Sequence, residues 1–157
     1  MTEKRKSWDE YFIGMARYVA TRSKDRSTKV GVVLVGEGHT VLGTGYNGMC
    51  RQINEKIESR YDRPLKYLYW EHGERNTLYN MARNGVKTLG ATMYIASCPE
   101  GLPPCADCAR AIIQCGIARL VYMKAMCPDR WKESCDAAME MLKESGVEVV
   151  IMEDGVE

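Results

Sequence analysis

The order of apolar patterns along these 157 residues predicts an α/β fold, with helices packed on the faces of a sheet. The first part of the chain shows the pattern of one helix followed by a strand hairpin. After a polar excursion, helix and strand patterns alternate three times. A helix between successive strands allows them to run parallel, joined by a right-handed crossover. No repeat, low-complexity segment or linker interrupts this order, so we expect residues 1–157 to form one domain.

The first helix is expected over about residues 7–23. Ser7 is the expected N-cap, because Glu10 follows three residues later in the pattern of a capping box. Apolar side chains then recur with helical spacing at Phe12, Met15, Ala16 and Val19.

A hairpin and an irregular excursion are expected next. Residues 29–35 are short and rich in valine, which predicts a buried strand, and residues 41–46 return as a second strand after a glycine-containing turn. Residues 47–69 are polar without a clear period, and loops of this length are usually functional or mobile. The later expected elements are a helix over 72–84, a strand over 91–96, a helix over 105–115, a strand over 119–123, a helix over 131–143 and a strand over 147–152.

Composition excludes several classes of protein. Hydrophobic residues make up 45% and charged residues 27% of the chain, which is typical of a globular protein. The formal net charge of +1 argues against a surface that coats nucleic acid. No apolar run approaches the roughly 20 residues of a membrane span, and the N-terminus is polar, so a cytoplasmic location is expected. Seven cysteines is an odd number, which argues against a disulfide framework.

Two short motifs carry the chemistry. His72-Gly73-Glu74 and Pro104-Cys105-Ala106-Asp107-Cys108 together offer one imidazole and two thiols, the ligands that zinc prefers. Three protein ligands leave a fourth position for water, which distinguishes a catalytic zinc from a structural one. The combination of His-x-Glu with Pro-Cys-x-x-Cys is the signature of zinc nucleobase deaminases, in which the glutamate moves protons and does not bind the metal.

The spacing of these residues suits that chemistry. Cys105 and Cys108 stand three residues apart at an expected helix start, so their sulfurs point to one side and the helix dipole favours thiolate. His72 stands at a second helix start, so two helix N-termini are expected to converge on one cation. Glu74 is two positions from His72, which places it beside the metal and not on it. Glu74 would take a proton from water and deliver protons to the ring nitrogen and to the leaving amine.

A structural zinc site is the competing interpretation. A lone Cys-x-x-Cys is often half of a zinc knuckle, but the second half is missing here. The chain has only two histidines, and His39 falls in the hairpin turn. Cys98 is the remaining candidate for a fourth ligand, which would close the site.

The chain resembles the cytidine and deoxycytidylate deaminase family, most closely its deoxycytidylate branch. The resemblance runs from Trp8 to about Val150. Besides the two metal motifs it rests on Ser27-Thr28-Lys29-Val30-Gly31 and Gly45-Tyr46-Asn47-Gly48. It implies a three-layer α/β/α sandwich with a five-stranded mixed sheet, a zinc cofactor and a homo-oligomer. The activity that it implies is hydrolysis of the small nucleotide dCMP to dUMP and ammonia.

The resemblance also implies substrate contacts. Asn47 is expected to hydrogen-bond the substrate, and the segment with Thr28 and Lys29 to lie near its phosphate. The family usually has alanine where Gly73 stands, but the backbone N–H of Gly73 can still contact the base. We add Arg26 to the phosphate candidates on its charge alone. Trp131, Tyr122 and Tyr69 are candidates for stacking on the base, and the alternative for each is a core or edge aromatic.

Two departures from the family leave alternatives open. The loop over residues 98–103 before the cysteines is extended, so a deaminase of another small nucleotide, nucleoside or base is the alternative. The excursion lacks the extra Cys/His pattern of some members, which argues against a second zinc and against triphosphate regulation. Near-neutral charge and the absence of a basic aromatic stripe weigh against polynucleotide editing. A zinc-stabilised binding module would have no use for Glu74.

Overall fold

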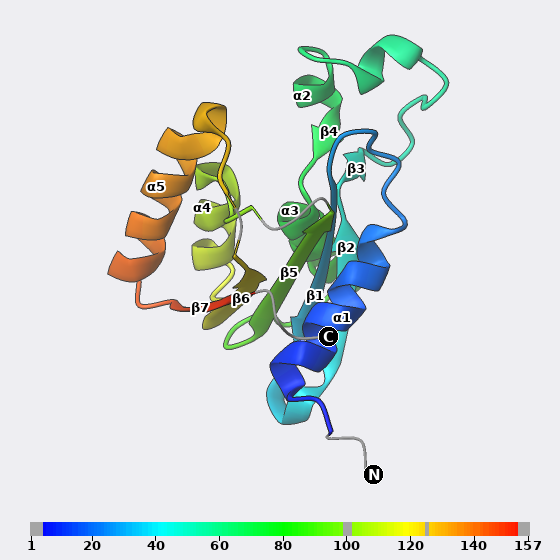
Figure 1. Ribbon diagram of the computed structural model, residues 1–157. Helices are drawn as coiled ribbons and strands as arrows, with labels where there is room; N and C mark the ends of the chain where they lie inside the picture. Colours follow the sequence, from blue (N-terminus) through cyan, green and yellow to red (C-terminus); the bar gives the residue numbers. More distant parts are fainter. Residues whose placement is uncertain (1–4, 99–101, 125, 154–157) are drawn as a thin grey trace.

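The computed structural model describes residues 5–98, 102–124 and 126–153 and shows a five-stranded mixed sheet with helices on both faces (Figure 1). The strands of this sheet are β1 (Lys29–Val35), β2 (Val41–Tyr46), β5 (Thr92–Cys98), β6 (Arg119–Met123) and β7 (Glu148–Met152). The helices are α1 (Trp8–Ala20), α2 (Lys66–Tyr69), α3 (Gly73–Asn84), α4 (Ala106–Gln114) and α5 (Asp129–Glu144). A separate two-stranded sheet pairs β3 (Gly48–Met49) with β4 (Trp70–Glu71).

The large sheet combines an antiparallel half with a parallel half. Its strand order is β2-β1-β5-β6-β7. β1 runs antiparallel to both β2 and β5, while β5–β6 and β6–β7 are parallel pairs joined through α4 and α5. The hairpin and the parallel alternation predicted from the sequence are therefore both confirmed.

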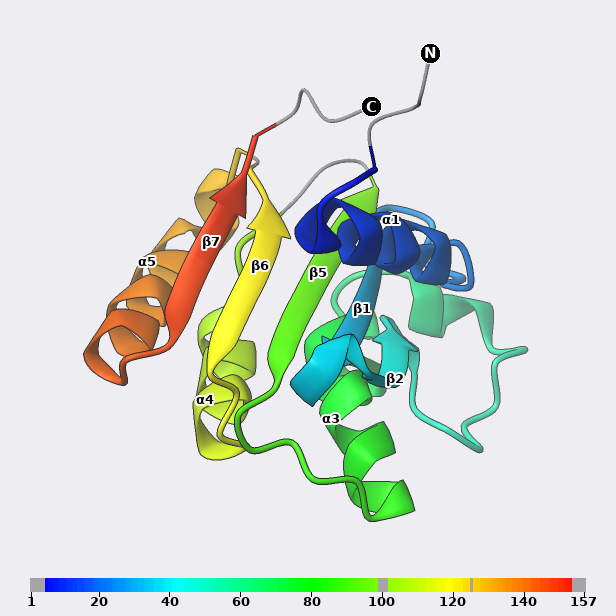
Figure 2. The ribbon, with the colours of Figure 1, turned by 90° about the horizontal axis from the view of Figure 1, so that it is seen from below.

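Helices cover the sheet in three layers. In Figure 2 α1 lies alone on one face among the described residues, and α3, α4 and α5 lie on the other. Strand side chains alternate between the two cores: Val32 and Leu34 of β1 pack toward α3 and α4, and Val33 and Val35 pack toward α1. A strand buried on both faces carries a continuous apolar run, which explains the valine-rich pattern of β1.

The N-terminal helix begins as its sequence predicts. The backbone N–H of Glu10 donates to the Ser7 side chain at 3.2 Å, and the Glu10 carboxylate accepts from the backbone N–H of Ser7, which completes the capping box. The helix ends at Ala20, a few residues before the expected end. It packs so closely on β1 that a Cβ at Gly31 would lie 2.1 Å from the backbone oxygen of Ala16.

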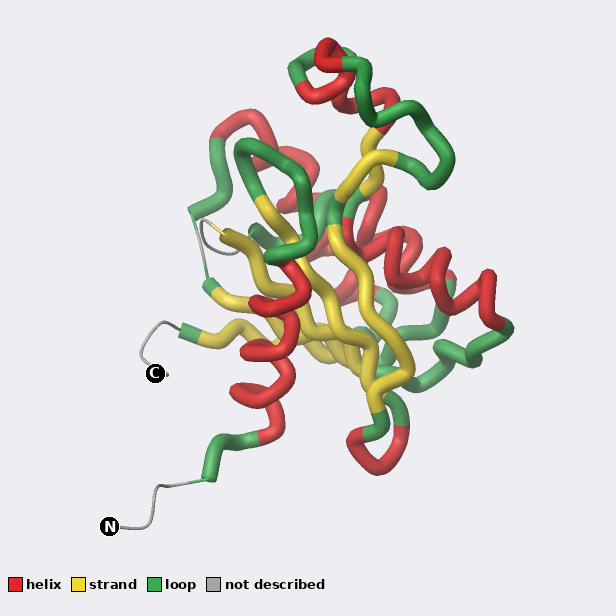
Figure 3. Tube along the Cα trace, turned by 90° about the vertical axis from the view of Figure 1, so that its right-hand side faces the viewer, coloured by secondary structure: helices red, strands yellow, loops and turns green. Residues whose placement is uncertain are grey.

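The excursion between β2 and α3 projects beyond one edge of the sheet (Figure 3). The sequence predicts this segment as irregular, but it contains the β3–β4 pair, a 3₁₀ turn over Glu58–Tyr61 and the short helix α2. Trp70 is buried at its base and donates its indole N–H to the carbonyl of Arg60 at 2.9 Å. The segment returns through β4 directly into α3, so its fold determines where α3 begins.

Among the described residues, no helix combines the length and the apolar character that a membrane span requires.

The contact between α1 and β1 leads to a stability prediction. We expect Gly31→Ala to lower the free energy of unfolding by at least about 1–3 kcal/mol, because the added methyl group overlaps backbone atoms that cannot rotate away. Urea unfolding followed by circular dichroism measures the change. Gly14→Ala is the matched control, since a Cβ there meets nothing within 4 Å, and it should raise stability by roughly 0.5–1 kcal/mol. An unchanged midpoint for Gly31→Ala would contradict the packing described.

Candidate metal centre and active site

Two helices begin at the same place, at the edge of the sheet where β5 ends. His72 is the residue before α3, and Cys105 is the residue before α4. Both residues have extended backbone and no side-chain cap, so their side chains are free to face one another. In open α/β sheets this edge, outside the carboxyl ends of the parallel strands, is where ligands bind.

The three predicted metal ligands meet here. The Nδ1 atom of His72 lies 3.4 Å from the sulfur of Cys105 and 3.5 Å from the sulfur of Cys108. A tetrahedral zinc with bonds of about 2.0–2.1 Å to nitrogen and about 2.3 Å to sulfur keeps these donor atoms about 3.5 Å apart. The donor set and its two nitrogen–sulfur distances therefore fit zinc. Within the described residues no fourth His, Cys, Asp or Glu joins the cluster, and the side chain of Cys98 lies outside them.

The pKa values of the three ligands are shifted by their close contact with one another. Hydrogen bonding from Cys108, with a further contribution from His72, lowers the pKa of Cys105 to about 4, so this sulfur is a thiolate at neutral pH. The hydrogen bond to Cys105, together with burial, raises the pKa of Cys108. The hydrogen bond with Cys105 raises the pKa of His72 to about 9. A divalent cation would displace the protons of Cys108 and His72 and take their place.

Glu74 stands beside the three ligands in the first turn of α3. Glu74 is only 6% exposed, and it lines the cavity that lies in front of the three ligands. Its carboxyl group lies close enough to His72, Cys105 and Cys108 for all three to influence its pKa. Burial is the largest influence and raises the pKa of Glu74. A buried carboxyl group near the metal ligands, but outside the ligand set, is placed to exchange protons with a substrate.

Arg75 forms ion pairs beside the cluster. It donates to the Glu71 carboxylate at 2.9 Å and lies 3.7 Å from that of Asp107. Because Asp107 lies between the two cysteines in the chain, Arg75 links the start of α3 to the start of α4. The neighbouring Asn76 contacts β2 instead, donating to the carbonyl of Tyr46 at 2.9 Å.

A cavity of about 340 Å³ opens in front of the metal cluster. Its walls come from the turn before β1, from Asn47, from the excursion and from the first turns of α5. Trp131 of α5 lies edge-on to His72, with ring centroids 6.0 Å apart, and Tyr67 of α2 meets Trp131 at 6.2 Å. The excursion and α5 therefore touch across the cavity. This volume is in the range of small-molecule sites.

The structure brings only some of the predicted substrate contacts to this cavity. Asn47 and Thr28 line it, whereas Gly73, Arg26 and Lys29 are not among the residues that line it. Arg26 points elsewhere: it pairs with Glu58 at 2.6 Å and stacks over Tyr61, and its side chain is 57% exposed. Its placement beside the phosphate rested on charge alone, and the structure gives that charge another partner.

The three aromatic candidates for stacking on the base lie in different parts of the structure. Trp131 lines the cavity next to a metal ligand. Tyr122 is buried in the core formed with α3, α4 and α5, which agrees with the alternative of a core aromatic. Tyr69 is not among the lining residues, and its ring instead receives the guanidinium of Arg60 at 4.3 Å.

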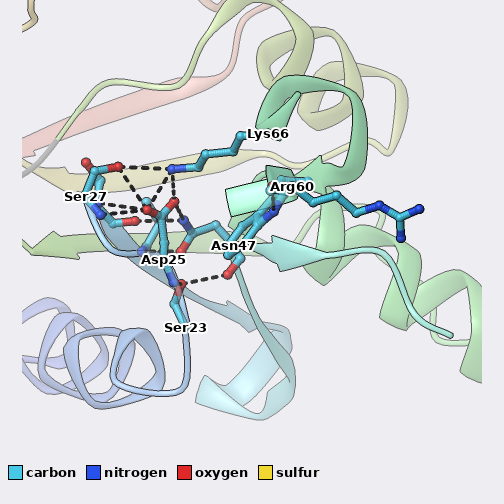
Figure 4. Close-up of polar contacts among 9 residues, drawn as sticks. Ser23, Asp25, Ser27, Asn47, Arg60 and Lys66 are labelled. Carbon is cyan, nitrogen blue, oxygen red and sulfur yellow. Dashed lines mark hydrogen bonds and ion pairs between the residues drawn. The ribbon is translucent and has the colours of Figure 1, made fainter. Parts of the chain in front are cut away.

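Asn47 is held by an unpredicted residue, the buried Asp25 (Figure 4). Both amide hydrogens of Asn47 are used, on Asp25 at 3.0 Å and on the carbonyl of Thr28 at 2.8 Å. Its amide oxygen accepts from the backbone N–H of Val30 at 2.7 Å. The side chain of Asn47 therefore retains one acceptor lone pair and no donor for a ligand.

Three of the four Lys and Arg side chains that line the cavity, Arg63, Lys66 and Arg130, were not predicted from the sequence. Arg63 and Lys66 belong to the excursion, where basic residues are interleaved with tyrosines at positions 61, 67 and 69. This mixture of basic and aromatic residues was the sequence signal that could have indicated a binding role for the excursion, because the segment shows no helix or strand period that would explain it.

Comparison with known proteins agrees with this geometry. The family model described as the cytidine and deoxycytidylate deaminase zinc-binding region matches residues 6–124. The chain belongs to this family. The deoxycytidylate deaminase of Mus musculus is 35% identical over 147 residues, which cover 89% of this chain and 76% of the mouse protein.

Solved structures share the fold. The crystal structure of dCMP deaminase from the cyanophage S-TIM5 in complex with dCMP and dUMP superposes with a TM-score of 0.74 at 24% identity, covering 96% of this chain and all of that one. A diaminohydroxyphosphoribosylaminopyrimidine deaminase/reductase from Thermotoga maritima superposes with a TM-score of 0.65 at 21% identity, over 92% of this chain and 36% of that one. The three-layer fold implied by the family resemblance is thereby confirmed.

The ligand geometry predicts how zinc content responds to substitution. We expect Cys105→Ala to lose most of its zinc, because two ligands cannot complete a protein-bound tetrahedral site. Elemental analysis of the purified variants measures zinc per chain. Cys50→Ser is the matched control, since Cys50 is exposed and outside the cluster, and it should keep the zinc content of the parent protein. Full zinc occupancy in Cys105→Ala would exclude Cys105 as a ligand.

Proposed function

We propose that this protein is a zinc-dependent hydrolytic deaminase that converts dCMP to dUMP and ammonia. The observation that carries the proposal is the cluster of three metal ligands with a free side, facing a cavity into which the buried Glu74 also points. His72, Cys105 and Cys108 would hold the metal. When bound, zinc lowers the pKa of water toward neutrality and so supplies the nucleophile without strong base.

Glu74 would perform the proton transfers. Its carboxylate accepts the proton of the attacking water and delivers it to N3 of the cytosine ring. It then transfers the second proton to the amino group at C4, so that the carbon–nitrogen bond breaks and ammonia leaves. One side chain can serve both steps because it lies beside the metal ligands and is excluded from bulk water.

Neighbouring residues would orient the nucleotide. Asn47 has a free acceptor but no free donor, so it can only accept a hydrogen bond, which suits a hydroxyl group of the sugar. Trp131 stands next to His72 and can limit the tilt of the base. Thr28 lies on the wall beside Asn47, and the backbone N–H of Gly73 is adjacent to a metal ligand.

The choice of dCMP rests on relatives. The mouse protein named deoxycytidylate deaminase aligns over most of this chain, and the cyanophage enzyme with the same fold was crystallised with dCMP and dUMP. The homo-oligomer implied by the family resemblance stays a prediction, and the mass in solution by light scattering tests it.

A substrate panel tests the proposal. Ammonia release from dCMP, CMP, deoxycytidine and cytosine should be fastest with dCMP. We expect Glu74→Gln to lower kcat by at least about 10²-fold, the usual scale of general acid–base catalysis, while zinc content and thermal stability stay close to those of the parent protein.

Two outcomes would contradict the proposal in different ways. Near-normal turnover by Glu74→Gln would remove Glu74 from the mechanism. A parent protein that releases ammonia from another amine-bearing base, but not from dCMP, would retain the deaminase chemistry and change the substrate.

A further inference from the structure

We propose that Arg63 and Arg130 together bind the 5′-phosphate of the substrate, as two guanidinium groups at the mouth of the cavity. The inference rests on the proposed function, since it assumes a nucleoside monophosphate. It assigns the phosphate to residues other than Arg26 and Lys29, the cations expected from the sequence. Arg63 belongs to the excursion before α2, and Arg130 belongs to the first turn of α5.

The charges of the cavity wall are the first support. Four cationic side chains of Lys or Arg line the cavity, and two of them are already neutralised. Lys66 pairs with Asp25 at 2.6 Å, and Arg75 pairs with Glu71 at 2.9 Å.

The other two cations have no such partner. Within the described chain, Arg63 and Arg130 form no ion pair, and the only contact recorded for either is that of Arg63 with the ring of Tyr67. Two positive charges at the mouth therefore remain without a carboxylate. A phosphate monoester carries a charge of about −1.5 to −2 near pH 7, which matches them.

The position of the pair is the second support. The guanidinium carbon of Arg63 lies 5.9 Å from the ring centroid of Tyr67, and Tyr67 in turn meets Trp131, the neighbour of Arg130. Both arginines are solvent-exposed, whereas Cys105 and Cys108 are buried. A nucleotide whose base reaches the metal ligands would therefore direct its phosphate toward the exposed end, where the arginines stand.

The contacts of Lys66 fix the position of the excursion that carries Arg63. The lysine ammonium group donates to Asp25 at 2.7 Å and to the hydroxyl of Ser27 at 3.0 Å, and the lysine side chain is only 14% exposed (Figure 4). The ammonium group of Lys66 is therefore engaged within the protein and is not available to a ligand. Lys66, which lies three residues after Arg63, instead anchors the excursion to the turn before β1.

The chemistry of arginine suits the assignment. Its planar guanidinium offers parallel N–H donors that match two phosphate oxygens, and such charge-assisted bonds are about twice as strong as neutral ones. Because both arginines would contact a part of the substrate that does not react, they should act mainly on binding. Their loss should raise KM for dCMP more than it lowers kcat.

The test compares substrates with and without the phosphate. Arg63→Ala and Arg130→Ala should each lower kcat/KM for dCMP by about 10–100-fold, the range for a lost hydrogen bond to a charged group. The preference for dCMP over deoxycytidine should fall by a similar factor. Calorimetric titration with dUMP and deoxyuridine provides a readout that does not depend on turnover, and dUMP binding should weaken in parallel. Arg83→Ala, an exposed arginine outside the cavity, is the matched control, and Arg26→Ala tests the position expected from the sequence.

The outcomes separate the inference from the proposed function. If the parent protein prefers dCMP and both variants keep that preference, the arginine pair is wrong and the function stands. An equal loss on dCMP and deoxycytidine would also overturn the pair, since a phosphate contact cannot affect a nucleoside. If the parent protein releases no ammonia from dCMP, the proposed function fails, and the inference fails with it.

Discussion

The close approach of the first residues of α3 and α4 is the constraint on which the active site depends. It places one imidazole nitrogen 3.4 and 3.5 Å from two sulfurs, the spacing of a tetrahedral site. Both helices direct their N-terminal N–H groups toward this point, which favours thiolate at Cys105, whose pKa is lowered to about 4. The same approach of the two helices places Glu74 beside the ligands, because Glu74 lies in the first turn of α3. The rest of the sheet serves to bring these two helix starts together.

A second buried charge organises the cavity. Asp25 accepts hydrogen bonds from the backbone of Ser27 at 2.8 Å, from Asn47 and from Lys66. Burial opposes the charged form, but the hydrogen bonds from Lys66 and Ser27 outweigh it, and the pKa of Asp25 is lowered. A buried carboxylate is stable only when its oxygens are satisfied in this way. The turn before β1, the start of β3 and α2 are thereby tied to one another through a single side chain.

Features encoded by short sequence motifs were predictable from the sequence, whereas contacts between distant segments were not. The capping box at Ser7, the valine-rich β1 and the three metal ligands were predictable, because each is encoded within a few neighbouring residues. The partners of Lys66 lie 39 and 41 residues away, and no local pattern reports such a pairing. Arg26 was assigned on its charge alone, yet its guanidinium pairs with Glu58, which lies 32 residues away in the chain. The metal ligands were thus visible in the sequence, whereas the cations Arg63, Lys66 and Arg130 of the cavity wall were not.

The most direct test of this account is zinc X-ray absorption spectroscopy of the purified protein. We expect two sulfur neighbours at about 2.3 Å, one imidazole nitrogen at about 2.0 Å and one further light atom, the signature of an open site with three protein ligands. A shell of three or four sulfurs would mean that another cysteine closes the site. That result would contradict a catalytic role for the metal and, with it, the proposed deamination.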